Sequence, residues 1–488
     1  MQKDSISVYN VVIREIVPSE ERRAKIVASA KELERRVSLA CEEMGVQAIV
    51  RVEGSVAKDT WLGDDPDVDV FVRLSTTIPR SSLGEIGLKI ARRATEGMRQ
   101  VERFAEHPYL EAFMDGVRVN IVPCYDAKSG EWMSATDRTP FHTDYVNERL
   151  NDGLRKEVLL LKKFLKGVGV YGAEIKIGGF SGYLCELLIL HYKSLDATLR
   201  EFSSFNRRKV IDIEKYYANR AREIDLLFKE SLVIIDPVDK ARNVASAVQP
   251  QKLHMLVAAA RAFLKDPDRV FFFPPKSKAL SPSELARDLE NHGPSIVLLA
   301  IGQVNAVPDV LWGQLYKTRR CLRKLLELGD FTVFRDAVWS DEKSLSVFLF
   351  ELDQSVLSEV RLHLGPPTER EKECEDFLAK YTANVEVVSG PYIAEGRWVV
   401  ELRRKFRNIV EFLNAKLEGG GENVGVAKLI SKAFADDYKI LSSGQVAPFC
   451  EKNHEFAVFA TEFLVGRPFW LKTSNNGQAA SVKPLPKV

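Results

Sequence analysis

Two aspartates at alternate positions, Asp67 and Asp69, follow a Gly54-Ser55 pair in the segment GSVAKDTWLGDDPDVDVFVR. In a β-strand, side chains two residues apart project from the same face of the sheet. The two carboxylates can therefore bind one cation together, while the valines between them face a core. Because oxygen ligands suit Mg²⁺, this spacing predicts a magnesium site.

The Gly54-Ser55 pair lies between the apolar run 46–52 and a polar segment that could begin a helix at Ser55. Free backbone N–H groups at such a turn can bind phosphates. Each piece has an ordinary alternative, because Gly-Ser pairs are common and a D-x-D on a strand is often a solvated edge. Their order and closeness favour a site for a metal ion and a triphosphate.

A third carboxylate from a neighbouring strand usually completes a two-metal site for phosphoryl or nucleotidyl transfer. The obvious donor is the strand 117–123, whose outward face carries Arg118 and Asn120. Asn120 stands where an aspartate is expected, and its amide brings no charge and cannot accept a proton. We therefore expect the ion held by Asp67 and Asp69 to remain, and the ion that activates the hydroxyl to bind poorly.

An Asp115-Gly116 pair predicts a two-residue hairpin turn within the alternating stretch 104–123. Counting outward from this turn places Glu111 opposite Asn120, with Cβ atoms about 5 Å apart on one face. Glu111 is thus a candidate replacement ligand. The alternative is an ordinary pair of exposed polar residues, which a slip of one residue in register would separate.

The composition is that of a globular protein of 488 residues, 45% hydrophobic and 28% charged, with a formal net charge of +2. This length predicts two to four domains. With so little net charge, a nucleic-acid surface must come from charges segregated by position. The cysteines form no C-x-x-C pair, and no apolar run is long enough to span a bilayer. We predict a cytoplasmic protein without a membrane partner.

The pattern of elements predicts an α+β multidomain protein. Strands at 47–52 and 68–74, a helix at 82–100 and the hairpin within 104–123 indicate a catalytic domain with a mixed sheet. Apolar stripes at helical spacing follow at 154–165, 180–192 and 254–264, and strands at 295–302 and 337–352 alternate with helices after a Pro-rich stretch. The predicted limits are 1–146 for the catalytic domain, 147–270 for a helical central domain, 271–470 for an α/β C-terminal region and 471–488 for a loose tail.

Several segments carry a resemblance to a known family. They are GSVAKDTWLGDDPDVDVF, AEHPYL at 105–110, VNIVPCY at 119–125, DRTPFH at 137–142, LLKKFLKGVGVYGAE at 160–174, GGFSGYLCELLI at 178–189 and DPVDKARNVASAV at 236–248. Over nearly its whole length the chain resembles the archaeal-type, class I CCA-adding enzymes, tRNA nucleotidyltransferases of the DNA polymerase β superfamily. The resemblance implies template-independent addition of C, C and A to the tRNA 3′ end from CTP and ATP, with Mg²⁺ as cofactor and pyrophosphate released. It also implies a homodimer.

The resemblance further implies roles for individual residues. Asp67, Asp69 and Asn120 occupy the catalytic, metal-binding positions, the last of which is an aspartate in the family. The implied nucleotide-binding residues are Gly54, Ser55, Lys58, His107, His142, Lys162, Tyr171 and Arg242. Lys58 stands where relatives often carry arginine, so it keeps the charge but lacks a bidentate fork.

These nucleotide-binding candidates also have ordinary alternatives. The alternatives are a solvated cation for Lys162, a packing aromatic for Tyr171, and loop side chains for His107 and His142. Arg242 could equally form a structural salt bridge with Asp236 or Asp239.

Basic clusters with interleaved aromatics in the C-terminal half are candidates for binding the tRNA acceptor arm. They lie at 316–324 (YKTRRCLRK) and 397–407 (RWVVELRRKFR). A helix bearing the first cluster would present a cationic stripe to the RNA backbone. The candidate RNA-binding residues are Lys317, Arg319, Arg320, Arg323, Lys324, Arg397, Arg403 and Arg404. The alternative is an ordinary solvated helix face.

Two alternatives for the activity remain open. The chain could be a catalytically weak tRNA- and nucleotide-binding variant, because losing a metal-bridging carboxylate costs on the order of several kcal/mol of barrier. It could also be a poly(A) polymerase-like terminal nucleotidyltransferase, since such enzymes share the Gly-Ser and D-x-D pattern.

Overall fold

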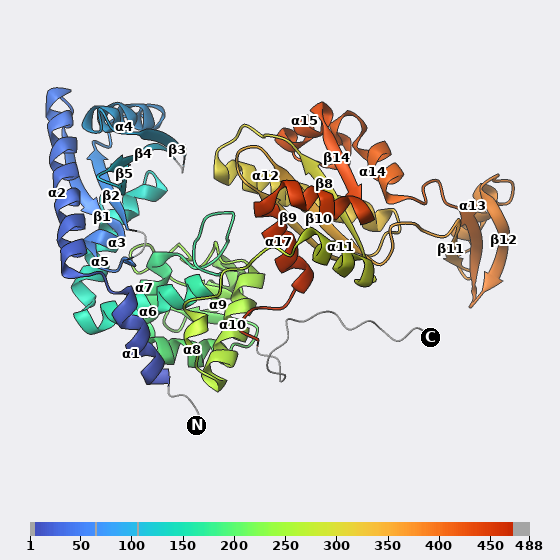
Figure 1. Cartoon of the computed structure of the whole chain (residues 1–488), viewed down its shortest axis with the longest axis horizontal. Coiled ribbons are helices and arrows are strands. Elements are labelled where there is room, and N and C mark those ends of the chain that lie inside the picture. The colour runs from blue at the N-terminus through green and yellow to red at the C-terminus, as the bar shows by residue number, and fades with distance from the viewer. Residues whose placement is uncertain (1–4, 64–65, 105–106, 472–488) are drawn as a thin grey trace. The chain divides into compact units, whose positions relative to one another are not determined.

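The computed structural model describes residues 5–63, 66–104 and 107–471, which form two compact units (Figure 1). The division falls between Pro275 and Lys276, and the chain returns to the first unit at Pro468. Apart from Leu471, the predicted tail 471–488 lies outside the described residues.

A five-stranded mixed sheet forms the N-terminal part of the first unit, in the order β1, β2, β5, β4, β3. The strands are β1 (Ala48–Glu53), β2 (Asp67–Leu74), β3 (Gln100–Phe104), β4 (Pro108–Met114) and β5 (Val117–Tyr125). β2 and β5 are parallel, and the other neighbours are antiparallel. The sequence patterns missed β3, because they extended the preceding helix to residue 100.

Helices α2 (Glu20–Glu43) and α4 (Arg80–Ala94) cover one face of this sheet (Figure 1). Their apolar residues share a core with the valines of β2. Asp67 and Asp69 alternate with these valines, so they project from the opposite face. The prediction that the two carboxylates share a face is confirmed.

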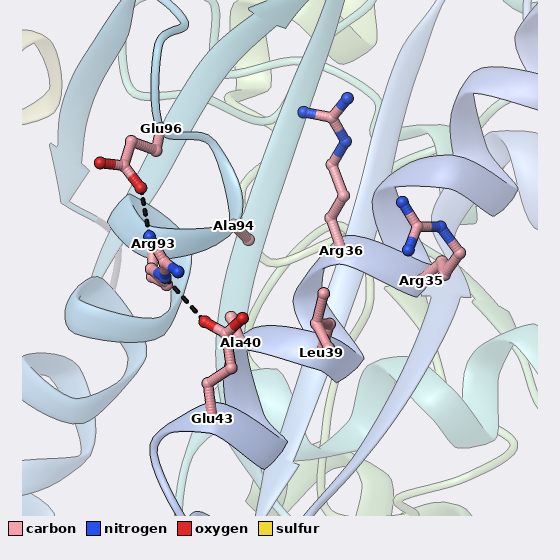
Figure 2. A pocket seen from close by; sticks show the side chains of 8 residues that line it. All are labelled: Arg35, Arg36, Leu39, Ala40, Glu43, Arg93, Ala94 and Glu96. Atoms are coloured by element: carbon pink, nitrogen blue, oxygen red, sulfur yellow. Dashed lines mark hydrogen bonds and ion pairs between the residues drawn. The ribbon is translucent and has the colours of Figure 1, made fainter.

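A surface pocket of about 250 Å³ lies between α2 and α4 (Figure 2). Arg93 joins the two helices there, since its Nε donates to Glu43 Oε2 at 2.8 Å, and it also pairs with Glu96. The lining residues are Arg35, Arg36, Leu39, Ala40, Glu43, Arg93, Ala94 and Glu96. Because α2 and α4 cover the face away from Asp67 and Asp69, this pocket is separate from the acidic pair.

The β4–β5 hairpin turns at Asp115 and Gly116, which both adopt left-handed backbone conformations, with φ of 49° and 78°. This is the geometry that an Asp-Gly pair favours in a two-residue turn. The turn fixes the register so that Glu111 lies opposite Asn120. The predicted hairpin and the predicted pairing are therefore confirmed.

The rest of the first unit is mainly helical. Its helices are α1 (Ser5–Ile16), α5 (Thr139–Arg149), α6 (Asp152–Gly167), α7 (Gly182–Tyr192), α8 (Leu195–Ser203), α9 (Ala221–Leu227) and α10 (Pro250–Lys265), with a parallel pair β6 (Lys209–Ile211) and β7 (Leu232–Ile234). α1 packs with this helical core through Val8, Val12 and Ile16, although the sequence grouped it with the catalytic domain. Trp470 also enters this core and stacks on Phe271, with ring centroids 5.9 Å apart.

The second unit contains an antiparallel four-stranded sheet in the order β14, β8, β10, β9. Its strands are β8 (Ser295–Ile301), β9 (Val333–Ser340), β10 (Ser346–Leu352) and β14 (Tyr438–Ser442), and its helices are α11 (Pro282–Asn291), α12 (Pro308–Leu328), α14 (Ile409–Leu417), α15 (Lys428–Asp436), α16 (Val446–Lys452) and α17 (His454–Val465). The single strand predicted at 337–352 is a hairpin instead. Asp341 makes the turn, because its carboxylate accepts the backbone N–H groups of Lys343, Ser344 and Leu345.

A smaller three-stranded sheet completes the second unit, with β13 (Arg397–Arg403) between β11 (Val360–Pro367) and β12 (Val387–Ala394). Helix α13 (Glu371–Tyr381) packs on it. Over the described part of the chain, no helix combines the length and the apolar character that crossing a membrane requires.

Candidate active site

Four polar residues form a row across the face of the five-stranded sheet that α2 and α4 do not cover. Glu53 of β1 lies opposite Asp69 of β2, Asp69 lies beside Asn120 of β5, and Asn120 lies opposite Glu111 of β4. Paired residues project from the same face, so the row brings three carboxylates and one amide together. Within it, Asn120 Nδ2 donates to Asp69 Oδ1 at 2.9 Å.

Gly54 permits the close approach of the Gly54-Ser55 turn to this row. β1 ends at Glu53, and the short helix α3 (Gly54–Ala57) begins at once, with φ of +72° at Gly54. A Cβ at this position would overlap Asp69 Oδ2. Burial raises the pKa of Asp69 to about 6, the negative charge of Asp67 adds to this effect, and the hydrogen bond from Asn120 opposes it.

The two outer carboxylates of the row are engaged elsewhere. Glu111 is 7% exposed and pairs with Arg103, whose Nη2 lies 3.0 Å from Glu111 Oε1. Glu53 is fully buried, its pKa is raised by that burial, and Arg51 Nε lies 3.4 Å from its Oε1. The structure thus provides Glu111 with a cationic partner, and its role as a replacement ligand stays a prediction.

Asp67 also has a cationic partner. Arg118, opposite it on β5, pairs with its carboxylate through two nitrogens, Nη2 donating to Oδ2 at 2.9 Å and Nε donating to Oδ1. β5 therefore faces the two acidic residues of β2 with a guanidinium and an amide.

Lys58 and Lys162 lie together in the interior, on either side of a carboxylate. Glu186 of α7 accepts hydrogen bonds from Lys58 Nζ at 2.5 Å, Lys162 Nζ at 3.2 Å and Thr60 Oγ1 at 2.6 Å. Burial alone would raise the pKa of Glu186, but the two lysines lower it to about 2. Lys162 is only 2% exposed, so the alternative of a solvated cation is wrong.

Tyr171 lies close to the buried lysines, beside Gly182 at the start of α7. A Cβ at Gly182 would lie 3.3 Å from both Tyr171 Oη and Lys162 Nζ, so these two groups converge on the start of α7. Burial raises the pKa of the Tyr171 hydroxyl, and the nearby charges of Glu186 and Asp67 add to the effect.

His142 and Arg242 meet on a second buried carboxylate, Asp236. His142 Nε2 lies 2.9 Å from Asp236 Oδ2, Arg242 Nη1 lies 2.7 Å from the same oxygen, and Tyr183 Oη donates to Oδ1 at 3.1 Å. The hydrogen bond from His142 lowers the pKa of Asp236 to about 2 against the effect of burial, whereas burial lowers the pKa of His142. The expected salt bridge between Arg242 and Asp236 is therefore present.

Tyr183 connects the two buried clusters. Its ring stacks on His142, with centroids 4.0 Å apart, and Lys58 Nζ lies 5.7 Å from the centre of the same ring. Five of the predicted nucleotide-binding side chains, Lys58, His142, Lys162, Tyr171 and Arg242, therefore lie in one region where α5, α6 and α7 meet the sheet.

Among the described residues, no hydrogen bond or ring contact joins His107 to this region. It precedes β4 by one residue, four positions before Glu111, which is roughly 13 Å along the strand at the usual rise per residue. It is 8% exposed, and its Nε2 is buried without a hydrogen-bond partner among the described residues.

The predicted RNA-binding cations divide into two groups. Lys317, Arg320 and Lys324 are exposed on α12, spaced so that they share one side of the helix. Arg319 and Arg323 instead pair with Asp336 of β9, at 3.2 and 2.5 Å. In the second cluster, Arg397 lines a pocket beside α13, Arg403 pairs with Glu359 at 3.1 Å and Arg404 pairs with Asp330.

The donor set on the sheet fits one Mg²⁺ ion. Asp67 and Asp69 supply two carboxylates on one face, and Gly54 leaves open the space beside Asp69 Oδ2 that any other Cβ would fill. Phosphate and water oxygens would complete the coordination. Within the described ranges, no group of three or more His, Cys, Asp or Glu side chains is placed to hold a metal ion.

Sequence reasoning missed two residues of the site, Glu186 and Tyr183, which lie in a segment that carries the family resemblance but were given no role. Asp236 was named only as a possible salt-bridge partner of Arg242. Glu186 could have been found, because it is a charged residue within the apolar helix α7 and a buried charge requires a partner.

A mixed sheet with an Asp pair beside a Gly-Ser turn, joined to a helical layer with buried lysines, defines a nucleotidyltransferase. Three family models match the chain: "Nucleotidyltransferase domain" at 34–142, "tRNA nucleotidyltransferase, second domain" at 156–273 and "CCA-adding enzyme, C-terminal domain" at 292–443. The chain belongs to the CCA-adding enzyme family and is a tRNA nucleotidyltransferase.

Three curated relatives illustrate the extent of the match, and each is called "CCA-adding enzyme". The protein of Methanosarcina barkeri is 35% identical over 456 residues, covering 93% of this chain and 97% of the relative. The protein of Halobacterium salinarum is 35% identical over 439 residues, covering 90% of this chain and 94% of the relative. The protein of Pyrobaculum aerophilum is 38% identical over 414 residues, covering 84% of this chain and 93% of the relative.

Proposed function

We propose that this chain adds C, C and A in turn to the 3′ end of tRNA, using CTP, ATP and Mg²⁺ and releasing pyrophosphate. The observation that carries the proposal is the placement of Asp67 and Asp69 on one face of the sheet, with Gly54 packed against Asp69. The identity of the curated relatives over more than four-fifths of the chain supports the choice of tRNA and of the three nucleotides.

Asp67 and Asp69 bind the metal ion, which compensates the charge of the triphosphate when bound. Gly54 and Ser55 hold the phosphates at the turn that follows β1. The 3′ oxygen of the RNA attacks the α-phosphorus, the bond to pyrophosphate breaks, and the hydroxyl proton leaves to water. Asn120 cannot take that proton, because an amide has no basic site at neutral pH.

In this proposal Lys58 contacts the triphosphate together with Ser55, and the other members of the buried clusters hold the rest of the nucleotide. Glu186 fixes Lys58 and Lys162, and Asp236 fixes His142 and Arg242, so the donors are held before the nucleotide arrives. Such preorganisation lowers the cost of ordering the site when the nucleotide binds. His107, for which the structure describes no contact with these groups, has no role in this proposal.

Single-turnover incorporation tests the proposal. Labelled CTP and ATP are supplied separately and together to tRNA that ends at the discriminator base. We expect two CMP additions followed by one AMP addition and then a stop. Continued AMP addition without CMP would instead favour a poly(A) polymerase-like activity, which shares the Gly-Ser and D-x-D pattern.

The weak-variant alternative is supported by Asn120, which stands in the position of the expected third carboxylate. It predicts tight tRNA and CTP binding with turnover reduced by several powers of ten. Measuring the dissociation constant for tRNA and the single-turnover rate on the same preparation separates binding from chemistry.

A further inference from the structure

Arg118 and Asn120 together make the face that carries Asp67 and Asp69 less negative than a two-metal site requires. The register places Arg118 opposite Asp67 and Asn120 beside Asp69, so β5 supplies one donor for each carboxylate of β2. Arg118 contacts both oxygens of Asp67, and Asn120 Nδ2 contacts Asp69 Oδ1. The two acidic residues therefore meet donors from β5 where a two-metal site requires a further anionic ligand.

The charge count on this face suits one divalent ion. Asp67 and Asp69 contribute −2 and Arg118 contributes +1, which leaves −1. A site with a carboxylate at position 120 and a neutral residue at position 118 would carry −3. The difference of two positive charges equals the charge of one Mg²⁺ ion.

Among the residues that the structure describes, the neighbouring charged groups have partners of their own and do not restore the missing negative charge. Glu111 is balanced by Arg103 at 3.0 Å, and Lys58 is balanced by the buried Glu186. Glu53, at the other end of the row, lies fully buried beside Arg51. The face therefore keeps its deficit of negative charge.

A basic cavity gives access to Arg118. It has a volume of about 360 Å³ and lies between α2 and the β4–β5 hairpin, next to Asp67 in the register of the sheet. Arg22, Lys25 and Arg103 line it together with Arg118, against the acidic Glu111 and Asp115. Four cations against two anions suit a phosphate of the RNA terminus.

We propose that the guanidinium of Arg118 takes the place of the second metal ion, so that this chain transfers nucleotides with a single divalent ion. This inference rests on the proposed nucleotidyl transfer. A fixed guanidinium can stabilise negative charge that develops on oxygen, as arginine does in other phosphoryl-transfer sites. A guanidinium only donates hydrogen bonds and cannot coordinate the 3′ oxygen as a metal ion does, so the RNA hydroxyl is oriented by its contacts rather than ionised by a metal.

Counting bound ions tests the inference without turnover. Mn²⁺ binding is measured by equilibrium dialysis and electron paramagnetic resonance, with α,β-methylene CTP and full-length protein. We expect one Mn²⁺ per chain for the unaltered protein and for Arg118→Gln, and two for Arg118→Gln/Asn120→Asp. Two ions bound by the unaltered protein would overturn the inference.

Single-turnover CMP incorporation by the same variants supplies the second readout. Arg118→Gln should be slower by about 100- to 1000-fold, the usual effect of removing one electrostatic donor, and the added Asn120→Asp should restore most of the rate. An unchanged rate in Arg118→Gln would also overturn the inference. Arg92→Gln, which removes an exposed partner of Glu102 on α4, is the matched control and should keep one ion and full activity.

Folding and function are tested separately. Circular dichroism checks each variant, and if Arg118→Gln is unfolded, Arg118→Lys replaces it: the charge remains, so one ion is expected, whereas two ions would contradict the inference. If the unaltered protein adds no CMP to tRNA but still binds one ion, and the double variant binds two, then the proposed reaction fails while the assignment of Arg118 holds.

Discussion

Glu186 is the residue that holds the two buried lysines of the candidate site. It is 1% exposed and lies between two lysines that come from distant parts of the chain. Removing one partner of a buried ion pair leaves an uncompensated charge, which is more costly than never having buried the pair. Glu186 therefore couples the stability of the first unit to the position of Lys58.

Replacing Glu186 with glutamine should lower the free energy of unfolding by about 3 to 5 kcal/mol at pH 7, because Lys58 and Lys162 lose their counter-charge. Urea unfolding measures the loss. Glu148→Gln is the control, since Glu148 forms an exposed pair with Arg149 and should change stability by less than about 0.5 kcal/mol.

The same ion group gives a pH dependence. The pKa of Glu186 is about 2 in the folded protein and 4.5 in the absence of perturbation, so the folded state favours the ionised form. Its stabilisation is complete above pH 4.5 and is lost as the pH falls from 4.5 towards 2. Between pH 2 and 4.5, the free energy of unfolding should depend less steeply on pH in Glu186→Gln than in the unaltered protein. The same steepness in both proteins would contradict the assignment.

Gly54 controls the geometry of the acidic pair. Alanine there would combine a left-handed backbone with a Cβ that overlaps Asp69 Oδ2. We expect Gly54→Ala to slow CMP incorporation by about 100-fold or more, because displacements of about 1 Å at reacting groups have effects of this size. Gly45→Ala is the control, with φ of +65° and no atom within 4 Å of the added Cβ, and it should transfer CMP at the normal rate.

At the scale of elements, local sequence patterns correctly predicted the features that depend only on neighbouring residues. The alternation at 67–72 and the Asp115-Gly116 pair were sufficient for the face of the carboxylates and for the Glu111–Asn120 register. β3 and the β9–β10 turn were missed, because the first continues a helical pattern and the second depends on the side chain of Asp341. The local sequence around α1 and Trp470 does not indicate that both pack into the core of the helical part of the first unit.

Helix α4 packs unusually close to the sheet through Gly87. An added Cβ there would lie 2.6 Å from Pro123 of β5. Although alanine favours helices over glycine by about 1 kcal/mol, overpacking should outweigh this gain, so Gly87→Ala should lower stability by about 1 to 3 kcal/mol. In Gly313→Ala, where α12 has open space, the urea midpoint should rise instead.

At the scale of the whole molecule, the site could be predicted only in part. The D-x-D spacing identified the face of the sheet that carries Asp67 and Asp69, and the resemblance supplied Lys58, His142, Lys162, Tyr171 and Arg242. The buried carboxylate that holds Lys58 and Lys162 was not found, because Lys58 and Glu186 are separated by 128 residues in sequence. No window of local sequence contains both members of such a pair.

Binding of tRNA should depend on the exposed cations of α12. Lys317→Gln/Arg320→Gln/Lys324→Gln should reduce the slope of log affinity against log salt concentration by about 2 to 3, roughly one for each lost phosphate contact. Filter binding at several salt concentrations measures the slope. In the control Lys31→Gln/Lys89→Gln, which alters α2 and α4 on the covered side of the catalytic sheet, the slope should not change.

The chain leaves the first unit after Pro275 and returns to it at Pro468, where Trp470 inserts beside Phe271. Within residues 5–471 as described, two covalent crossings therefore join the units. A protease that nicks the backbone at either crossing would leave both halves attached by the other, and the cut polypeptide would still migrate as one particle under native conditions.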